Sequence, residues 1–147
     1  MQKKIGLFGG CFNPPHIGHF HLIESAIDQY CLDEIIFIPC MNSPYNDKVI
    51  NIDSNHRINM LMEGLATFSH SWKIEMFEIN NKDIVSYTID TIKFIKDTYG
   101  NENDYFLICG HDTASRFDTW KNSSKLTQEI DICIAGKNFE CIELNIR

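Results

Sequence analysis

Long apolar runs are absent from this 147-residue sequence, and so is an excess of positive charge. No stretch approaches the roughly 18 consecutive apolar residues of a membrane-spanning helix, so we expect no membrane partner. There are 13 lysines and arginines against 20 acidic residues, and the net charge is −7. Sequence-independent nucleic-acid binding needs a basic surface, so this charge argues against a nucleic-acid partner. The glycine pair follows the N-terminus too closely for a signal peptide, and we expect a cytoplasmic protein.

Paired metal-binding cysteines are absent as well. The six cysteines include no Cys-x-x-Cys pair and form no cluster with histidine at zinc-ligand spacing. Most of them lie within apolar runs, so we expect small buried side chains in a reducing compartment. They are Cys11, Cys31, Cys40, Cys109, Cys133 and Cys141.

Short apolar strands alternate with amphipathic segments along the chain. This alternation predicts one α/β domain over residues 1–147, with a doubly wound parallel sheet covered by helices on both faces. Ligands bind such sheets beyond the carboxyl ends of the strands, where polar clusters fall at 9–19, 40–48 and 110–112. The predicted strands are Lys3–Phe8, Glu34–Pro39, Trp72–Ile79, Tyr105–Cys109, Asp131–Ala135 and Glu140–Leu144. The predicted helices are Gly18–Tyr30, Ser54–Thr67, Tyr87–Tyr99, Asp112–Phe117 and Ser124–Glu129.

Single residues predict the helix ends and faces. Ser86 is the expected N-cap of the helix that Gly100 ends. In the helix that begins at Ser54, Met62 is expected on the buried face and Arg57 in a solvated first turn.

The string from Gly9 to His19, Gly-Gly-Cys-Phe-Asn-Pro-Pro-His-Ile-Gly-His, is the most informative part of the sequence. It joins an apolar strand to the start of a helix, where backbone N–H groups and the positive end of the helix dipole can hold phosphates. Gly9 and Gly10 permit close backbone approach. His16 and His19 add imidazole donors for developing negative charge.

Two further clusters have both a structural and a functional interpretation. Tyr87 and Thr88 begin a helix whose first-turn N–H groups can bind a carboxylate, although an ordinary capped helix explains them too. Asp112 follows a strand and a glycine and suits a ribose diol, while Trp120 can stack on a flat ring. A helix cap and a core anchor are the alternatives for these two residues.

The three clusters together resemble the (T/H)xGH nucleotidyltransferase superfamily, and within it the nicotinate (nicotinamide) mononucleotide adenylyltransferase family. The resemblance runs in order from Lys3 to about Ala135 and implies a Rossmann-like nucleotidyltransferase fold. It implies catalytic roles for His16 and His19. It implies phosphate contacts by Gly9, Gly10, Cys11, Phe12 and Gly18, and mononucleotide contacts by Tyr87, Thr88, Asp112 and Trp120.

The activity implied is adenylyl transfer from ATP to nicotinate mononucleotide, giving nicotinate adenine dinucleotide and pyrophosphate in NAD biosynthesis. Mg²⁺ would bridge the phosphates of ATP with mostly water ligands. The alternatives are adenylylation of nicotinamide mononucleotide or phosphopantetheine, and a non-catalytic nucleotide-binding relative. Ser86-Tyr87-Thr88 and the cluster of Asp112 and Trp120 argue against phosphopantetheine as the acceptor.

The sequence departs from the family pattern at several places, among them Lys121 after the tryptophan and Gly136-Lys137 where the family has arginine. Cys11 replaces the usual hydroxyl residue, and residues 43–46 read Ser-Pro-Tyr-Asn where the family has Pro-Pro-His-(Lys/Arg). The family's Ile-Ser-Ser-Thr-x-Ile-Arg motif, which serves the β- and γ-phosphates, is missing. We therefore expect a fold truncated at its carboxyl end, with little transferase activity in this form and self-association through an exposed apolar patch.

Overall fold

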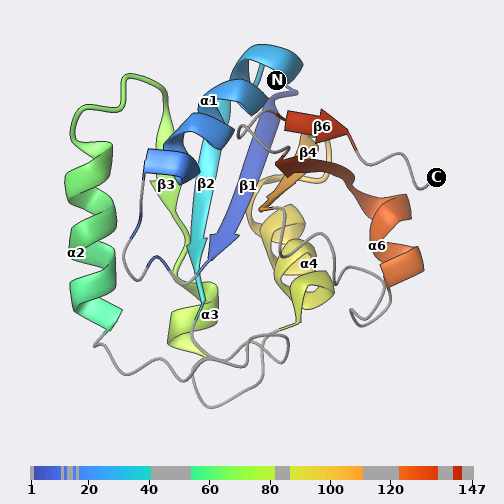
Figure 1. The fold of residues 1–147 in the computed structure, drawn as a ribbon. Coiled ribbons are helices and arrows are strands. Elements are labelled where there is room, and N and C mark those ends of the chain that lie inside the picture. The colour runs from blue at the N-terminus through green and yellow to red at the C-terminus, as the bar shows by residue number, and fades with distance from the viewer. Residues whose placement is uncertain are drawn as a thin grey trace.

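The computed structural model describes residues 2–10, 12, 15, 17–40, 54–81, 87–110, 123–135 and 141–143. In these residues six strands form one sheet in the order β3-β2-β1-β4-β5-β6 (Figure 1). The first five strands pair in parallel, and β6 pairs antiparallel with β5. The strands are β1 (Lys4–Gly10), β2 (Glu34–Pro39), β3 (Trp72–Ile74), β4 (Asp104–Cys109), β5 (Asp131–Ala135) and β6 (Cys141–Glu143).

The central strands are apolar because both faces of the sheet are covered. All six residues of β2 are buried, as expected for a strand between two helical layers. Leu7 of β1 lies opposite Ile36 of β2 on one side and Leu107 of β4 on the other. The chain adds strands outward from β1 in both directions, so the strand order reverses next to β1. Open α/β sheets bind ligands at such a reversal.

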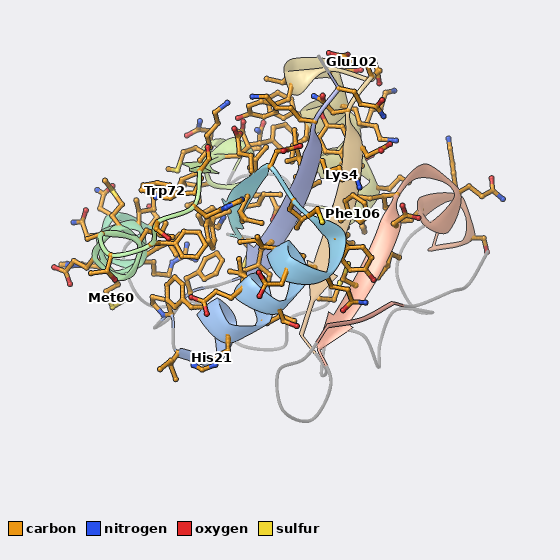
Figure 2. All side chains as sticks on the ribbon, turned by 90° about the horizontal axis from the view of Figure 1, so that it is seen from above. Lys4, His21, Met60, Trp72, Glu102 and Phe106 are labelled. Carbon is orange, nitrogen blue, oxygen red and sulfur yellow. The ribbon has the colours of Figure 1, made fainter. Side chains whose placement is uncertain are left out.

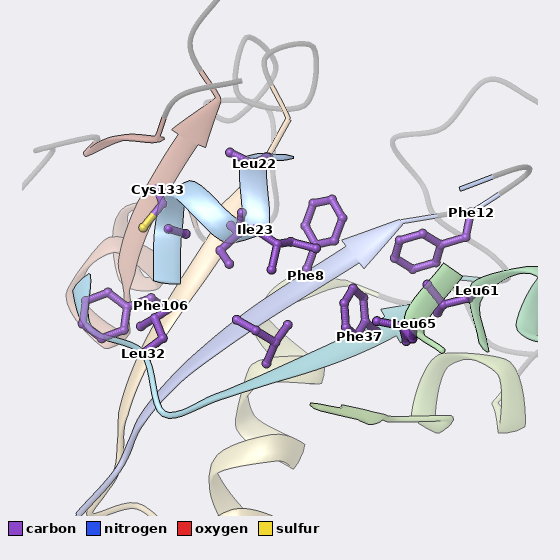
Figure 3. Close-up of a cluster of buried hydrophobic side chains, with 13 residues drawn as sticks. Phe8, Phe12, Leu22, Ile23, Leu32, Phe37, Leu61, Leu65, Phe106 and Cys133 are labelled. Carbon is purple, nitrogen blue, oxygen red and sulfur yellow. The ribbon is translucent and has the colours of Figure 1, made fainter. Parts of the chain in front are cut away.

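Helices cover the two faces through two separate cores (Figure 2). Helices α1 (Ile17–Tyr30) and α2 (Ser54–Leu65) lie on one face, and α4 (Thr88–Tyr99) and α6 (Ser123–Glu129) lie on the other. Figure 3 shows the first core, where Ile23 of α1 and Leu65 of α2 gather with Phe8 and Phe37 of the sheet. The doubly wound α/β fold is therefore confirmed, with β6 as the one strand that departs from the parallel pattern.

The segment predicted as a strand over Trp72–Ile79 is only partly a strand. After β3 the chain turns into a short helix, α3 (Phe77–Asn80). The Glu75 carboxylate accepts the Phe77 N–H at 2.9 Å and starts the turn. The Phe77 ring stacks on Phe94 of α4, with centroids 4.3 Å apart. The alternation of apolar and polar residues predicted a longer strand, but the cap by Glu75 and the contact with α4 favour a helix after Ile74.

Two predictions about α2 are wrong. Met62 is 49% exposed, whereas Arg57 is fully buried. Residues four apart share one helix face, so Arg57, Leu61 and Leu65 form the inward row and Met62 turns away from it.

The helix ends follow local chemistry. Tyr87, rather than Ser86, occupies the N-cap position of α4, in an extended conformation with φ −100° and ψ 140°. Ser86 itself lies outside the described residues. Gly100 ends α4 with φ +120°, as predicted. Helix α1 ends at Tyr30, and the next residue, Cys31, is exposed and has φ +54°. The Leu32 N–H donates to the Ile27 carbonyl at 3.2 Å. This closes a Schellman motif with cysteine where glycine is usual.

Three of the remaining cysteines lie in the described part of the chain. Cys40, Cys109 and Cys133 are buried, as predicted, while Cys11 and Cys141 fall outside the described side chains. The exposed Cys31 contradicts the prediction of a buried side chain, because the end of α1 carries it to the surface. The described helices include none that is both long and apolar enough to span a membrane.

Candidate active site

The candidate site lies at the carboxyl ends of β1, β2 and β4. These strands are neighbours in the sheet, with β1 between the other two, so the three polar clusters follow adjacent strand ends, as predicted. β1 ends in Gly9 and Gly10, which lie opposite Ile38 and Pro39 of β2. Cys40, directly after β2, donates its N–H to the Gly10 carbonyl at 2.9 Å.

Packing does not explain why Gly9 and Gly10 are glycines. Neither has a positive φ. A Cβ at Gly9 would approach no atom closer than 3.7 Å, and one at Gly10 would lie 3.5 Å from the Phe12 ring. Both distances are ordinary van der Waals contacts, so the described part of the fold has room for an alanine at either position. The absence of side chains there leaves the backbone open to a ligand.

Gly110, just after β4, has the same property. A Cβ there would meet no atom of the described residues within 4 Å. The next residues, including Asp112 and Trp120, lie outside the described part of the chain, as do Cys11 and His16. Their predicted contacts stay predictions.

Phe12 belongs to the hydrophobic core. Its side chain is 3% exposed, and its ring meets Phe8 and Phe37 edge-on, with centroids 5.7 Å and 6.1 Å away. Its φ of +49° is unusual for a bulky residue and marks a sharp turn directly after β1. A phosphate contact at Phe12 would therefore have to come from its backbone.

His19 lies in the first turn of α1, with its ring held by two aromatic side chains. The ring centroids of Phe8 and Phe12 are 5.6 Å and 5.8 Å from that of His19, at interplanar angles of 62° and 82°. The His19 side chain is half-buried, whereas His21 is exposed and points away from the sheet (Figure 2). Of these two histidines, only His19 is oriented by the core.

The start of α1 is suited to negative charge. Its first turn carries no acidic side chain, and Gly18 in that turn is buried. The first N–H groups and the dipole of a helix N-terminus favour an anion.

The start of α4 lies at the edge of the sheet where the parallel strands end (Figure 1). The Tyr87 carbonyl accepts the N–H groups of Asp90 and Thr91, each at 3.1 Å, and no side chain of Tyr87 caps the helix. Thr91 donates its hydroxyl to Glu78 Oε2 at 2.9 Å, which ties the first turn of α4 to α3. Tyr87 and Thr88 therefore lie at a helix N-terminus that a hydrogen bond to α3 holds in place. Their predicted contact with a carboxylate requires such a position.

Sequence reasoning missed Arg57. Its Nη1 donates to the Cys40 carbonyl at 2.7 Å, and both groups are buried. The four-residue spacing from Arg57 to Leu61 and Leu65 was the available signal, because it places the arginine on the apolar face of α2.

Comparison with known proteins agrees with this geometry. A family model described as cytidylyltransferase-like matches residues 7–145. A probable nicotinate-nucleotide adenylyltransferase of Bacillus licheniformis is 36% identical over 129 residues, which cover 88% of this chain and 67% of that protein. The nicotinate-nucleotide adenylyltransferase of Bacillus subtilis is 36% identical over 125 residues, covering 85% of this chain and 65% of its own length. The chain thus spans about two thirds of the length of these relatives.

Solved structures show the same fold. The nicotinic acid mononucleotide adenylyltransferase of Plasmodium falciparum, complexed with NaAD, aligns with a TM-score of 0.75 and 21% identity, over 90% of this chain and 64% of its own. A putative nicotinate-nucleotide adenylyltransferase of Vibrio parahaemolyticus aligns with a TM-score of 0.73 and 20% identity, over 90% and 73%. The sheet order and the glycine turn place the molecule in the class of Rossmann-like nucleotidyltransferases. Together with the sequence matches, they show that the chain belongs to the nicotinate-nucleotide adenylyltransferase family.

Proposed function

We propose that the protein, in a form that also carries the family's Ile-Ser-Ser-Thr-x-Ile-Arg motif, transfers the adenylyl group of ATP to nicotinate mononucleotide. A phosphate oxygen of the mononucleotide attacks the α-phosphorus of ATP, the bond from that phosphorus to the bridging β-phosphate oxygen breaks, and pyrophosphate leaves. The products are nicotinate adenine dinucleotide and pyrophosphate. The observation that carries the proposal is the Gly9–Gly10 end of β1, where packing among the described residues demands no glycine, followed by the start of α1 with His19 in its first turn.

No protein nucleophile is required, because the mononucleotide's own phosphate attacks. The work of the site is then positioning and charge stabilisation. The open backbone at Gly9 and Gly10 and the first turn of α1 would hold the phosphates. His19, aimed by Phe8 and Phe12, would donate to the charge that develops at the α-phosphate, with His16 as its predicted partner.

The acceptor would bind by the carboxyl ends of β4 and the start of α4. The first-turn N–H groups at Tyr87 and Thr88 suit the nicotinate carboxylate, which nicotinamide lacks. Asp112 and Trp120 are the predicted contacts for the ribose and the pyridine ring. Asp90 is exposed in the same turn, and its charge offsets part of the helix dipole.

We assign Mg²⁺ to the ATP substrate. Among the described residues, no three side chains of histidine, cysteine, aspartate or glutamate gather as a metal-binding group. The net charge of −7 supports small-molecule partners over nucleic acid, and we propose a cytoplasmic enzyme.

The test is pyrophosphate release from ATP and Mg²⁺ with nicotinate mononucleotide, nicotinamide mononucleotide or phosphopantetheine as the acceptor. Nicotinate mononucleotide should give the highest kcat/KM. Equal or better turnover of phosphopantetheine contradicts the assignment, and ATP binding without turnover of any acceptor indicates a non-catalytic nucleotide-binding protein.

The role of His19 is tested in the same assay. His19→Ala should lower kcat by about 10²–10³, the usual loss for one preorganised donor. His21→Ala is the matched control on the same helix and should leave kcat unchanged. A His19→Ala enzyme with wild-type kcat removes this side chain from the mechanism.

A further inference from the structure

Arg57 is a fully buried cation close to the candidate site. Its side chain is 0% exposed in the first turn of α2. Its Nη1 donates to the Cys40 carbonyl at 2.7 Å, 17 residues earlier in the chain. A buried guanidinium is costly unless its donors are bonded. Leu61 and Leu65, on the same helix face, supply the apolar packing that attaches α2 to the core.

Cys40 connects Arg57 with the glycine turn. While its carbonyl accepts from Arg57, its N–H donates to the Gly10 carbonyl at 2.9 Å. The residue before it, Pro39, lies opposite Gly10 and has no N–H to offer. The Cys40 N–H is therefore the donor from this end of β2 that fixes the Gly10 peptide.

The hydrogen bond from Arg57 to Cys40 joins the end of β2 to the first turn of α2. The chain leaves the sheet at Cys40 and enters α2 at Ser54, and Arg57 in the first turn of α2 reaches back to Cys40. One side chain thus holds the end of β2, the start of α2 and, through one peptide, the end of β1.

We infer that Arg57 is a positioning residue that fixes the Gly9–Gly10 turn for the triphosphate of ATP. This inference rests on the proposed function. Arg57 acts through Cys40 and does not itself touch the substrate. A small displacement of a binding element can lower the rate of a positioned reaction by up to about 10²-fold, so the bond from Arg57 to Cys40 affects ATP use more than it affects acceptor binding.

The test compares three variants of the full chain. Arg57→Met keeps an unbranched side chain but removes the donor, Arg57→Lys restores one donor, and Leu65→Ala damages the same helix face without touching Cys40. KM for ATP, KM for the mononucleotide, kcat and the urea midpoint are measured for each. Arg57→Met should raise KM for ATP by about tenfold or more and lower kcat, with KM for the mononucleotide within about twofold of wild type. Arg57→Lys should recover part of that loss.

Leu65→Ala should lower the urea midpoint while KM for ATP stays within about twofold of wild type. If Arg57→Met and Leu65→Ala lower the midpoint alike and both keep the wild-type KM for ATP, Arg57 serves the fold alone and the inference is overturned.

Amide hydrogen exchange gives a readout that needs no turnover. The Cys40 N–H should exchange about tenfold faster in Arg57→Met than in wild type, with Arg57→Lys between the two, whereas the amides of β4 should not change. Equal Cys40 exchange rates in Arg57→Met and wild type overturn the inference. If wild-type protein neither binds nor uses ATP, the proposed function fails, and the Cys40 exchange rate still decides whether Arg57 fixes this turn.

Discussion

The ring of Phe12 should control catalysis through His19 without touching a substrate. Phe12→Leu removes the ring that lies 5.8 Å from the His19 ring but keeps the Cβ and the backbone with φ +49°. The matched control is Phe37→Leu. The Phe37 ring lies 6.3 Å and 6.1 Å from the rings of Phe8 and Phe12, and no ring contact of it with His19 occurs among the described residues.

The expected loss of stability is similar in the two variants. An edge-to-face pair contributes about 0.5–1.5 kcal/mol beyond area burial. Phe12 makes three such contacts and Phe37 makes two. Leucine still fills much of the space at either position, so both variants should lose about 1–4 kcal/mol of unfolding free energy.

The two variants should differ in kcat. Without the Phe12 ring, one of the two aromatic side chains that orient His19 is gone, and kcat should fall by about 10–10²-fold. Phe37→Leu should keep kcat within about threefold of wild type. Urea unfolding and pyrophosphate release measure the two effects on the same samples. An equal loss of kcat in both variants, or none in Phe12→Leu, refutes the idea that the ring aims His19.

Three further predictions concern stability, each measured by urea unfolding. Gly6→Ala should lower the free energy of unfolding by about 1–3 kcal/mol, because the new Cβ would lie 2.7 Å from Ile35 Cδ1. Adding Ile35→Val, which removes that Cδ1 atom, should restore part of the loss. If the losses of the two single variants simply add in the double variant, the clash is contradicted. Cys31→Gly should raise the free energy of unfolding by about 0.5–1 kcal/mol, because glycine adopts φ +54° without strain, at some cost in backbone entropy. A variant less stable than wild type would contradict the idea that Cys31 is strained. Burial, and then the hydrogen bond to Glu75, raise the pKa of Tyr99 from 10.0 to about 12. The folded state therefore favours neutral Tyr99. The stability that Tyr99 contributes in this way is complete below pH 10 and is lost as the pH rises through 12. The stability advantage of wild type over Tyr99→Phe should shrink over that range, and a constant difference would exclude the linkage.

Elements with strong local signals could be predicted from the sequence. The predicted and observed bounds of β2 agree at Glu34–Pro39, and those of β5 agree at Asp131–Ala135. Both are short apolar runs with polar residues at their ends, so local composition suffices. β3 ended earlier than predicted because Glu75 caps a turn and Phe77 stacks on Phe94, and the second of these contacts depends on the tertiary structure.

The candidate site was predictable where the motif is contiguous. Gly9, Gly10, Gly18 and His19 lie at the end of β1 and the start of α1, as the sequence predicted. Their chemical roles remain predictions. Arg57 was misjudged because its partner is a backbone carbonyl, and a carbonyl has no residue-type signature in a sequence.

The glycines of β1 show why sequence alone could not assign their roles. Gly6, Gly9 and Gly10 lie on one strand, and nothing in the residue type distinguishes them. At Gly6 an added Cβ would lie within 3.0 Å of the Cδ1 atoms of Ile35, Leu32 and Ile108, so packing opposes a side chain there. At Gly9 and Gly10 an added Cβ would make ordinary contacts, so packing makes no such demand. Packing among the described residues therefore opposes a side chain at Gly6 but does not account for Gly9 or Gly10. That contrast, added to the motif, is the physical argument for our proposal that phosphate binds at the end of β1.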